Sequence, residues 1–229
     1  MKRNAEETGQ ATVLEEGEIF FYFRPRAGGD DPDGDGRRLF MILHPLRKSR
    51  YRLIALGRRH TPAFKGAAPR LRASIDKVMP TLEELREALT AQEYRAGNRG
   101  NRIRPAALQA AEGIYAILKY RDDTHLIYAL DQPVRDGGLL EEMGVSQEGG
   151  YTANVRNPDS VEGAGSGRHP DFPGPLLERF QGKESIPVDP VEFLNAEGAE
   201  LVLTGVMRDP SEGMGLEFNS RNGSRTGDH

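Results

Sequence analysis

The chain has 229 residues, a net charge of −4 and 29% charged side chains, but no cysteine. The lack of cysteine excludes disulfides, thiolate nucleophiles and cysteine-ligated zinc or iron–sulfur sites. The first seven residues lack the apolar stretch of a secretory signal, and no apolar run approaches the ~20 residues that span a bilayer. We therefore expect a cytoplasmic protein without a membrane partner.

Three apolar runs follow one another between Glu18 and His60, at residues 19–23, 39–43 and 51–56. Each is five or six residues long, rich in aromatic or branched side chains, and bounded by glycine, proline or charge, which is typical of β-strands. They predict an antiparallel meander. The second run is apolar on both faces, so it should be a central strand with helices over its second face.

Residues 69–79 and 81–94 predict two helices. The apolar stripe of the first has helical spacing and consists of Leu71, Ile75 and Val78. The second begins with a capping box, in which Thr81 accepts from the backbone amide of Glu84 and the Glu84 side chain reaches back.

A glycine-rich basic loop at residues 96–102 and an alanine-rich helix at 105–111 are expected next. They lead to a β-hairpin, because the apolar runs 114–120 and 125–130 flank the polar turn 121–124.

The rest of the chain predicts short elements: a helix at 139–143, a strand at 151–155, a loop at 157–175, and helices at 176–181 and 190–197 before a strand at 199–207. The start of the last helix has an N-cap aspartate, an N1 proline and an N3 glutamate, which are Asp189, Pro190 and Glu192. Strands and helices mix without βαβ alternation. We therefore expect one α+β domain over residues 15–208, a mostly antiparallel sheet covered by helices, between disordered ends at 1–14 and 209–229.

Residues 17–26, 124–130 and 199–205 resemble segments of an uncharacterised family of bacterial proteins. The likeness spans about residues 17–206. It implies a shared fold and no particular chemistry, since no activity is known for that family.

Positive charge is concentrated between Arg37 and Ser74, where eleven lysine or arginine residues occur without one acidic residue. Those at the ends of the predicted strands are candidate anion-binding residues: Arg47, Lys48, Arg50, Arg52, Arg58 and Arg59. Such a strand edge beside Tyr51 suits a nucleic acid or another polyanion. The acidic residues of 112–229 are the competing partners, either within the fold or across the interface of a homo-oligomer.

The histidines give a second hypothesis, a hydrolase with a His/Asp site, for which the candidates are His44, His60, His169 and Asp171. His44 and His60 both follow predicted strands and would lie close together if those strand ends align. The aspartates at 31, 33 and 35 match only half of a calcium loop, because Ile42 stands where the bidentate glutamate belongs. We predict no metal and no cofactor. The leading hypothesis is a non-catalytic binding or accessory protein that uses the arginine-rich edge.

Overall fold

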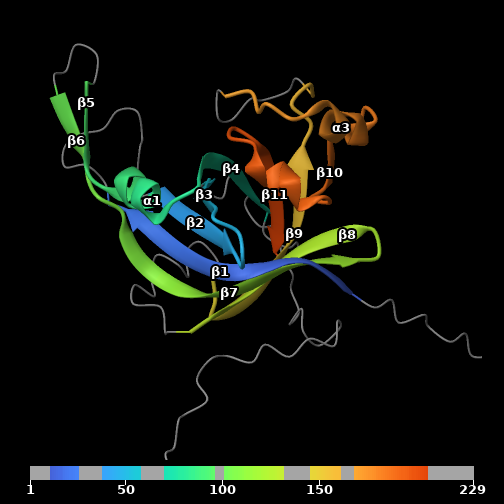
Figure 1. The fold of residues 1–229 in the computed structure, drawn as a ribbon, viewed down its shortest axis with the longest axis horizontal. Helices are drawn as coiled ribbons and strands as arrows, with labels where there is room; N and C mark the ends of the chain where they lie inside the picture. The colour runs from blue at the N-terminus through green and yellow to red at the C-terminus, as the bar shows by residue number, and fades with distance from the viewer. Residues whose placement is uncertain are drawn as a thin grey trace, which may run out of the picture.

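The computed structural model describes residues 11–25, 38–57, 70–95, 101–131, 145–160 and 168–205. Eight strands form a closed antiparallel barrel (Figure 1). They are β1 (Thr12–Arg24), β2 (Arg38–Pro45), β3 (Tyr51–Leu56), β4 (Arg70–Met79), β7 (Leu108–Tyr120), β8 (Asp123–Leu130), β9 (Glu148–Arg156) and β11 (Glu200–Gly205). The order around the barrel is β1, β2, β3, β4, β11, β9, β8, β7, and β7 pairs with β1 to close the circle.

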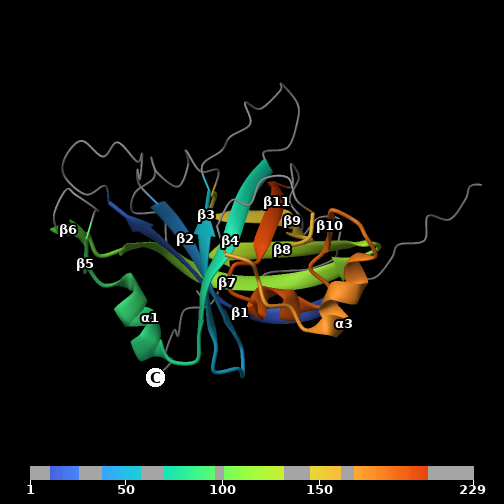
Figure 2. The same ribbon diagram turned by 90° about the horizontal axis from the view of Figure 1, so that it is seen from above.

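The smaller elements lie outside this circle. Strand β10 (Ser185–Pro187) pairs with the end of β9, and β5 (Gln92–Arg95) and β6 (Asn101–Arg104) form a separate two-stranded ribbon. The described helices are α1 (Leu82–Leu89), α3 (Gly174–Leu177) and the 3-10 helices η2 (Glu178–Phe180) and η3 (Val191–Asn195). Helix α1 and the ribbon lie on one side of the barrel and α3 on the other (Figures 1 and 2).

The predicted α+β fold is wrong, because the sheet closes on itself instead of lying under a layer of helices. The main error is at residues 70–79, which form β4 and not a helix. Leu71, Ala73 and Ile75 are buried inside the barrel while Arg70 and Arg72 are exposed, which is the period of two of a half-buried strand. Leu71 and Ile75 are four residues apart, a spacing that places two residues on one face of a helix and also on one face of a strand.

The predicted helix at 105–111 is also wrong, because β7 starts at Leu108 and pairs with both β1 and β8. The helix predicted for 81–94 starts as expected, with the amide of Glu84 donating to Thr81 Oγ1 at 3.2 Å. It ends at Leu89, and the chain then enters the ribbon.

The antiparallel meander and the hairpin of β7 and β8 are confirmed. Strands within 151–155 and 199–205 and a helical turn within 176–181 are confirmed too.

The helix predicted at 190–197 is only the short η3. Asp189 does not cap it and instead accepts a 2.8 Å hydrogen bond from Lys119. Residues 12–14, expected in a disordered end, belong to β1. The helix predicted at 139–143, residues 1–10 and the tail after Gly205 lie outside the described residues.

Alternate side chains of each strand fill the barrel, among them Ile19, Phe21, Met41, Ile54 and Ile117, each no more than 2% exposed. The outer face of β2 is also buried, because Leu85, Ala88 and Leu89 of α1 pack with Phe40 and Ile42 in a second cluster. The prediction that β2 is central and covered by a helix is therefore confirmed.

One end of the barrel, which we call the capped end, is formed by the β2–β3 turn (Leu46–Arg50) and by residues 168–199. Phe172, Phe180 and Phe193 of this segment pack on one another with ring centroids 5.4 to 6.0 Å apart. All three belong to the same apolar cluster as the barrel interior. The segment therefore continues the core beyond the strands and closes this end.

None of the helices in the described ranges has the length and apolar character needed to cross a membrane.

Candidate functional site

A buried ion pair lies inside the capped end of the barrel. Arg52, the second residue of β3, faces inward and is 0% exposed. Its Nη1 donates to Oε1 of Glu15 on β1, and its Nη2 donates to Oε2 at 3.1 Å. Its Nε donates to Oδ1 of Asn195 on η3 at 3.0 Å. One guanidinium thus connects two strands of the barrel to the segment that closes it.

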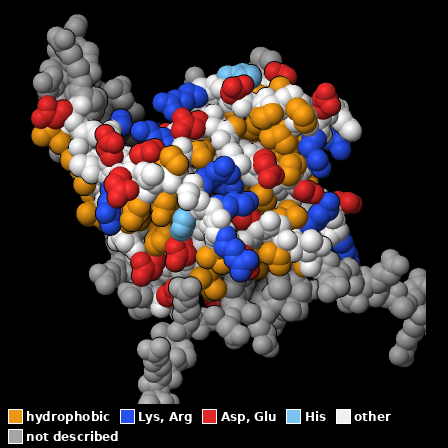
Figure 3. Space-filling model, in the orientation of Figure 1, with side chains coloured by type: hydrophobic (Ala, Val, Ile, Leu, Met, Phe, Trp, Pro, Cys, Tyr) orange, Lys and Arg blue, Asp and Glu red, His pale blue; other side chains and the backbone are white. Residues whose placement is uncertain are grey.

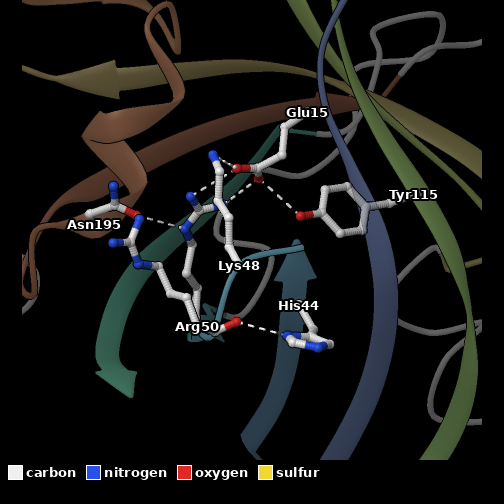
Figure 4. Close-up of polar contacts among 7 residues, drawn as sticks. Glu15, His44, Lys48, Arg50, Tyr115 and Asn195 are labelled. Carbon is white, nitrogen blue, oxygen red and sulfur yellow. Dashed lines mark hydrogen bonds and ion pairs between the residues drawn. The ribbon is translucent and has the colours of Figure 1, made fainter. Parts of the chain in front are cut away.

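Two further groups complete the partners of the Glu15 carboxylate (Figure 4). The Tyr115 hydroxyl on β7 donates to Oε1 at 2.9 Å, and Lys48 Nζ on the β2–β3 turn lies 3.5 Å from Oε2. Burial first, and then the Glu15 charge, raise the pKa of Tyr115 well above its usual value. This buried carboxylate is therefore paired and hydrogen-bonded on both oxygens, as a charge inside a protein requires.

Arg52 was predicted to lie on an exposed anion-binding edge, and the structure places it elsewhere. Its guanidinium is inside the barrel and already donates to two side chains, so it is not available to an external anion. The counter-charge comes from Glu15 in the N-terminal part of the chain, not from the acidic C-terminal half. Arg52 has a structural role in the capped end.

The other predicted cations of the β2–β3 turn remain at the surface. Arg47 and Lys48 are exposed and Arg50 is partly buried; we call these three the basic turn. Glu15 is shared by Arg52 and Lys48, so the buried pair leaves an excess of positive charge at this rim. Figure 3 shows lysine and arginine side chains near the middle of the face in view, with carboxylates around them. Acidic residues also lie close to the turn in the fold, because Glu18 pairs in register with His44 on the neighbouring strand.

Arg58 and Arg59 lie outside the described residues. Among the four described candidates, Arg52 is buried, so it does not share an exposed edge with Arg47, Lys48 and Arg50.

Of the candidate histidines, His44 is the second-last residue of β2. Its Nδ1 lies 2.9 Å from the Arg50 carbonyl oxygen, and its ring stacks on Tyr51 with centroids 4.2 Å apart. His60 lies outside the described residues.

His169 and Asp171 are exposed near the capped end. The Nε2 atom of His169 is 3.8 Å from an oxygen of Asp159, beyond hydrogen-bond distance, and both side chains are mostly in solvent. Over the described parts of the chain, no three His, Asp or Glu side chains are grouped closely enough to hold a metal ion. The hydrolase hypothesis thus gains no support from the described histidines.

Sequence reasoning missed Glu15, Tyr115 and Asn195, the partners of the buried arginine. A signal for Glu15 was present, because it shares the alternation of Ile19 and Phe21, which points into the core. No comparable signal marks Tyr115 or Asn195, since their approach to Arg52 depends on pairing between distant strands.

A comparison with protein families, curated proteins and solved structures finds no match to this chain. The resemblance to a bacterial family and the homo-oligomer both stay predictions.

Proposed function

We propose that the protein is a non-catalytic binding protein that uses the basic turn to hold an anionic partner, with single-stranded nucleic acid as the partner to test first. The observation that carries this proposal is the arrangement of charge at the capped end. Three cations lie on one short turn above a carboxylate that Arg52 already neutralises. A partner's phosphates would supply the missing negative charge.

The turn is fixed in place, which favours binding because little ordering is needed. Its backbone amides at Leu46 and Arg50 donate to Glu16 and Lys48 carbonyls at 2.9 and 2.8 Å. The stacked rings of His44 and Tyr51 lie directly beside it. A stacked aromatic pair next to cations suits a nucleic-acid strand, whose bases stack while its phosphates pair.

The test is binding of a fluorescein-labelled 20-nucleotide single strand, followed by anisotropy at several salt concentrations. The variant is Arg47→Asn with Lys48→Gln and Arg50→Gln. Asparagine is chosen at position 47 because its φ is 61°, a left-handed conformation that asparagine tolerates. We expect at least tenfold weaker binding, with the salt slope reduced by about 2.

The control replaces three exposed cations elsewhere, Arg70→Gln, Arg72→Gln and Lys183→Gln, and changes the net charge equally. It should bind within about twofold of the wild type. An equal loss of affinity in both variants would show that binding depends only on net charge, which contradicts a specific role of the basic turn. Wild-type affinity in the basic-turn variant would also refute the proposal.

A further inference from the structure

His44 is held in one orientation beside the basic turn (Figure 4). It lies on the outer face of the barrel, because Leu43 before it points into the core and successive side chains of a strand alternate between faces. Its ring is parallel to that of Tyr51, with centroids 4.2 Å apart and 8° between the planes. The stack and the contact with the Arg50 carbonyl together fix the position of the imidazole.

The contact with Arg50 decides which ring nitrogen of His44 carries a proton. The Arg50 carbonyl oxygen, 2.9 Å from Nδ1, can only accept a hydrogen bond, so Nδ1 is the donor. In the neutral ring Nε2 then has no proton. Nε2 has no hydrogen-bond partner in the described parts of the chain and is not among the buried polar atoms that lack one, so it reaches solvent. Nε2 is therefore the atom at which His44 gains a proton and a positive charge.

The groups that face His44 carry charge of both signs. Glu18 lies opposite it on β1, Tyr51 on β3 faces it with its ring, and the three cations of the basic turn follow it in the chain. Within the described ranges, no carboxylate forms an ion pair with the imidazole. The cations of the turn oppose a further positive charge at His44, and Glu18 favours it.

A phosphate bound to the basic turn would change this balance. Its negative charge favours the protonated ring, and by linkage the protonated ring then binds phosphate more tightly. An unperturbed histidine changes its charge between about pH 5 and 8. We propose that His44 is a proton-controlled binding residue, whose protonated Nε2 donates to a phosphate of the nucleic acid in mildly acidic solution. This inference rests on the proposed function and adds to it a fourth cation that is present only in acid.

The test measures the affinity of the full chain for a fluorescein-labelled 20-nucleotide thymidine strand at about pH 5.5 and 7.5. Thymine has no group that titrates in this range, so an effect of pH belongs to the protein. We expect the wild type to bind about fivefold more tightly at the lower pH, with a salt slope steeper by about 0.7 from one additional phosphate contact. Circular dichroism confirms that the chain is folded at both pH values.

Two substitutions separate the charge of His44 from its other contacts. His44→Phe keeps a ring that stacks on Tyr51, and His44→Gln keeps a side-chain donor for the Arg50 carbonyl. Neither residue gains a charge in acid, so the affinity of both variants should differ by less than about twofold between the two pH values. The matched control is the exposed His169→Gln, which should keep the wild-type ratio.

A wild-type ratio in both His44 variants would assign the pH effect to another group and overturn the inference. Equal affinity of the wild type at the two pH values would also overturn it. In that case, weaker binding by the basic-turn variant at pH 7.5 would still support the proposed function. If the wild type binds the strand at neither pH, both proposals fail.

Discussion

Glu15 and Arg52 are 37 positions apart in the chain and form a two-pronged ion pair inside the barrel, next to the Tyr115 hydroxyl. Their strands, β1 and β3, do not pair directly with each other, because β2 lies between them. The pair therefore spans a strand, and it fixes the spacing of the barrel wall at the capped end.

Removing one member of this pair should be costly. Arg52→Met leaves the Glu15 carboxylate buried without its main partner, so we expect the free energy of unfolding to fall by about 3–5 kcal/mol. Urea denaturation followed by circular dichroism measures it. The double variant Glu15→Leu with Arg52→Met should recover most of the loss, since no charge is then left buried. A cost below about 1 kcal/mol for Arg52→Met would contradict the structural role.

Tyr115 predicts a loss of stability in alkaline solution. Its pKa is raised in the folded protein, so above about pH 10 the unfolded chain loses a proton that the folded one keeps. Stability should then fall as pH rises, by up to ~1.4 kcal/mol per pH unit for this group. Tyr115→Phe should reduce that slope, and should also cost about 1–2 kcal/mol near pH 7 through the lost hydrogen bond to Glu15. An unchanged alkaline slope would refute the assignment.

His125 predicts a loss of stability in acid. It is 9% exposed, its Nδ1 has no hydrogen-bond partner among the described residues, and burial lowers its pKa against the opposing effect of Asp123. Below about pH 6.5 the unfolded chain takes up a proton that the folded one does not, so stability falls as pH decreases. His125→Gln should flatten this dependence between about pH 5 and 6.5 in urea titrations. The exposed His169→Gln is the control and should keep the wild-type profile.

Gly113 predicts a steric limit between β7 and β8. A Cβ atom there would lie 2.0 Å from the Ala129 carbonyl oxygen and 2.7 Å from the Leu130 Cα, both backbone atoms. Gly113→Ala should therefore lower the free energy of unfolding by about 3 kcal/mol or more. At Gly174 in α3 nothing lies within 4 Å, so Gly174→Ala should change it by less than about 1 kcal/mol. Equal effects of the two substitutions would contradict the close approach.

Many strands of the barrel wall could be predicted from the sequence because each has a recognisable apolar run and a recognisable end. The runs at β1, β2 and β3 and the hairpin of β7 and β8 have short turns or apolar alternation that need no distant partner to be recognised. The helix predicted at 69–79 rests on the spacing of three apolar residues, and the strand found there could not be recognised locally. Strand β4 pairs with β3 across a long connection and with β11, whose residues come more than 120 positions later. Closure of the barrel depends on those distant pairings, and no local pattern encodes them.

The candidate site was predictable only in part for the same reason. The cations of the basic turn lie on a hairpin, and their proximity follows from the local sequence. Whether Arg52 points inward, and what it meets there, depends on the pairing of β1 with β2 and on η3 folding over the end. A buried arginine and a surface arginine look alike in a sequence.

The position of β11 in the barrel has a consequence for synthesis on the ribosome. This strand fits between β4 and β9, so the wall stays open until residues 200–205 have left the ribosome. Until then the nascent chain presents two unpaired edges, which are the usual starting points for association with other chains. The edges of β4 and β9 therefore stay open to chaperones until β11 is made. Pairing of β11 with both strands then closes the barrel.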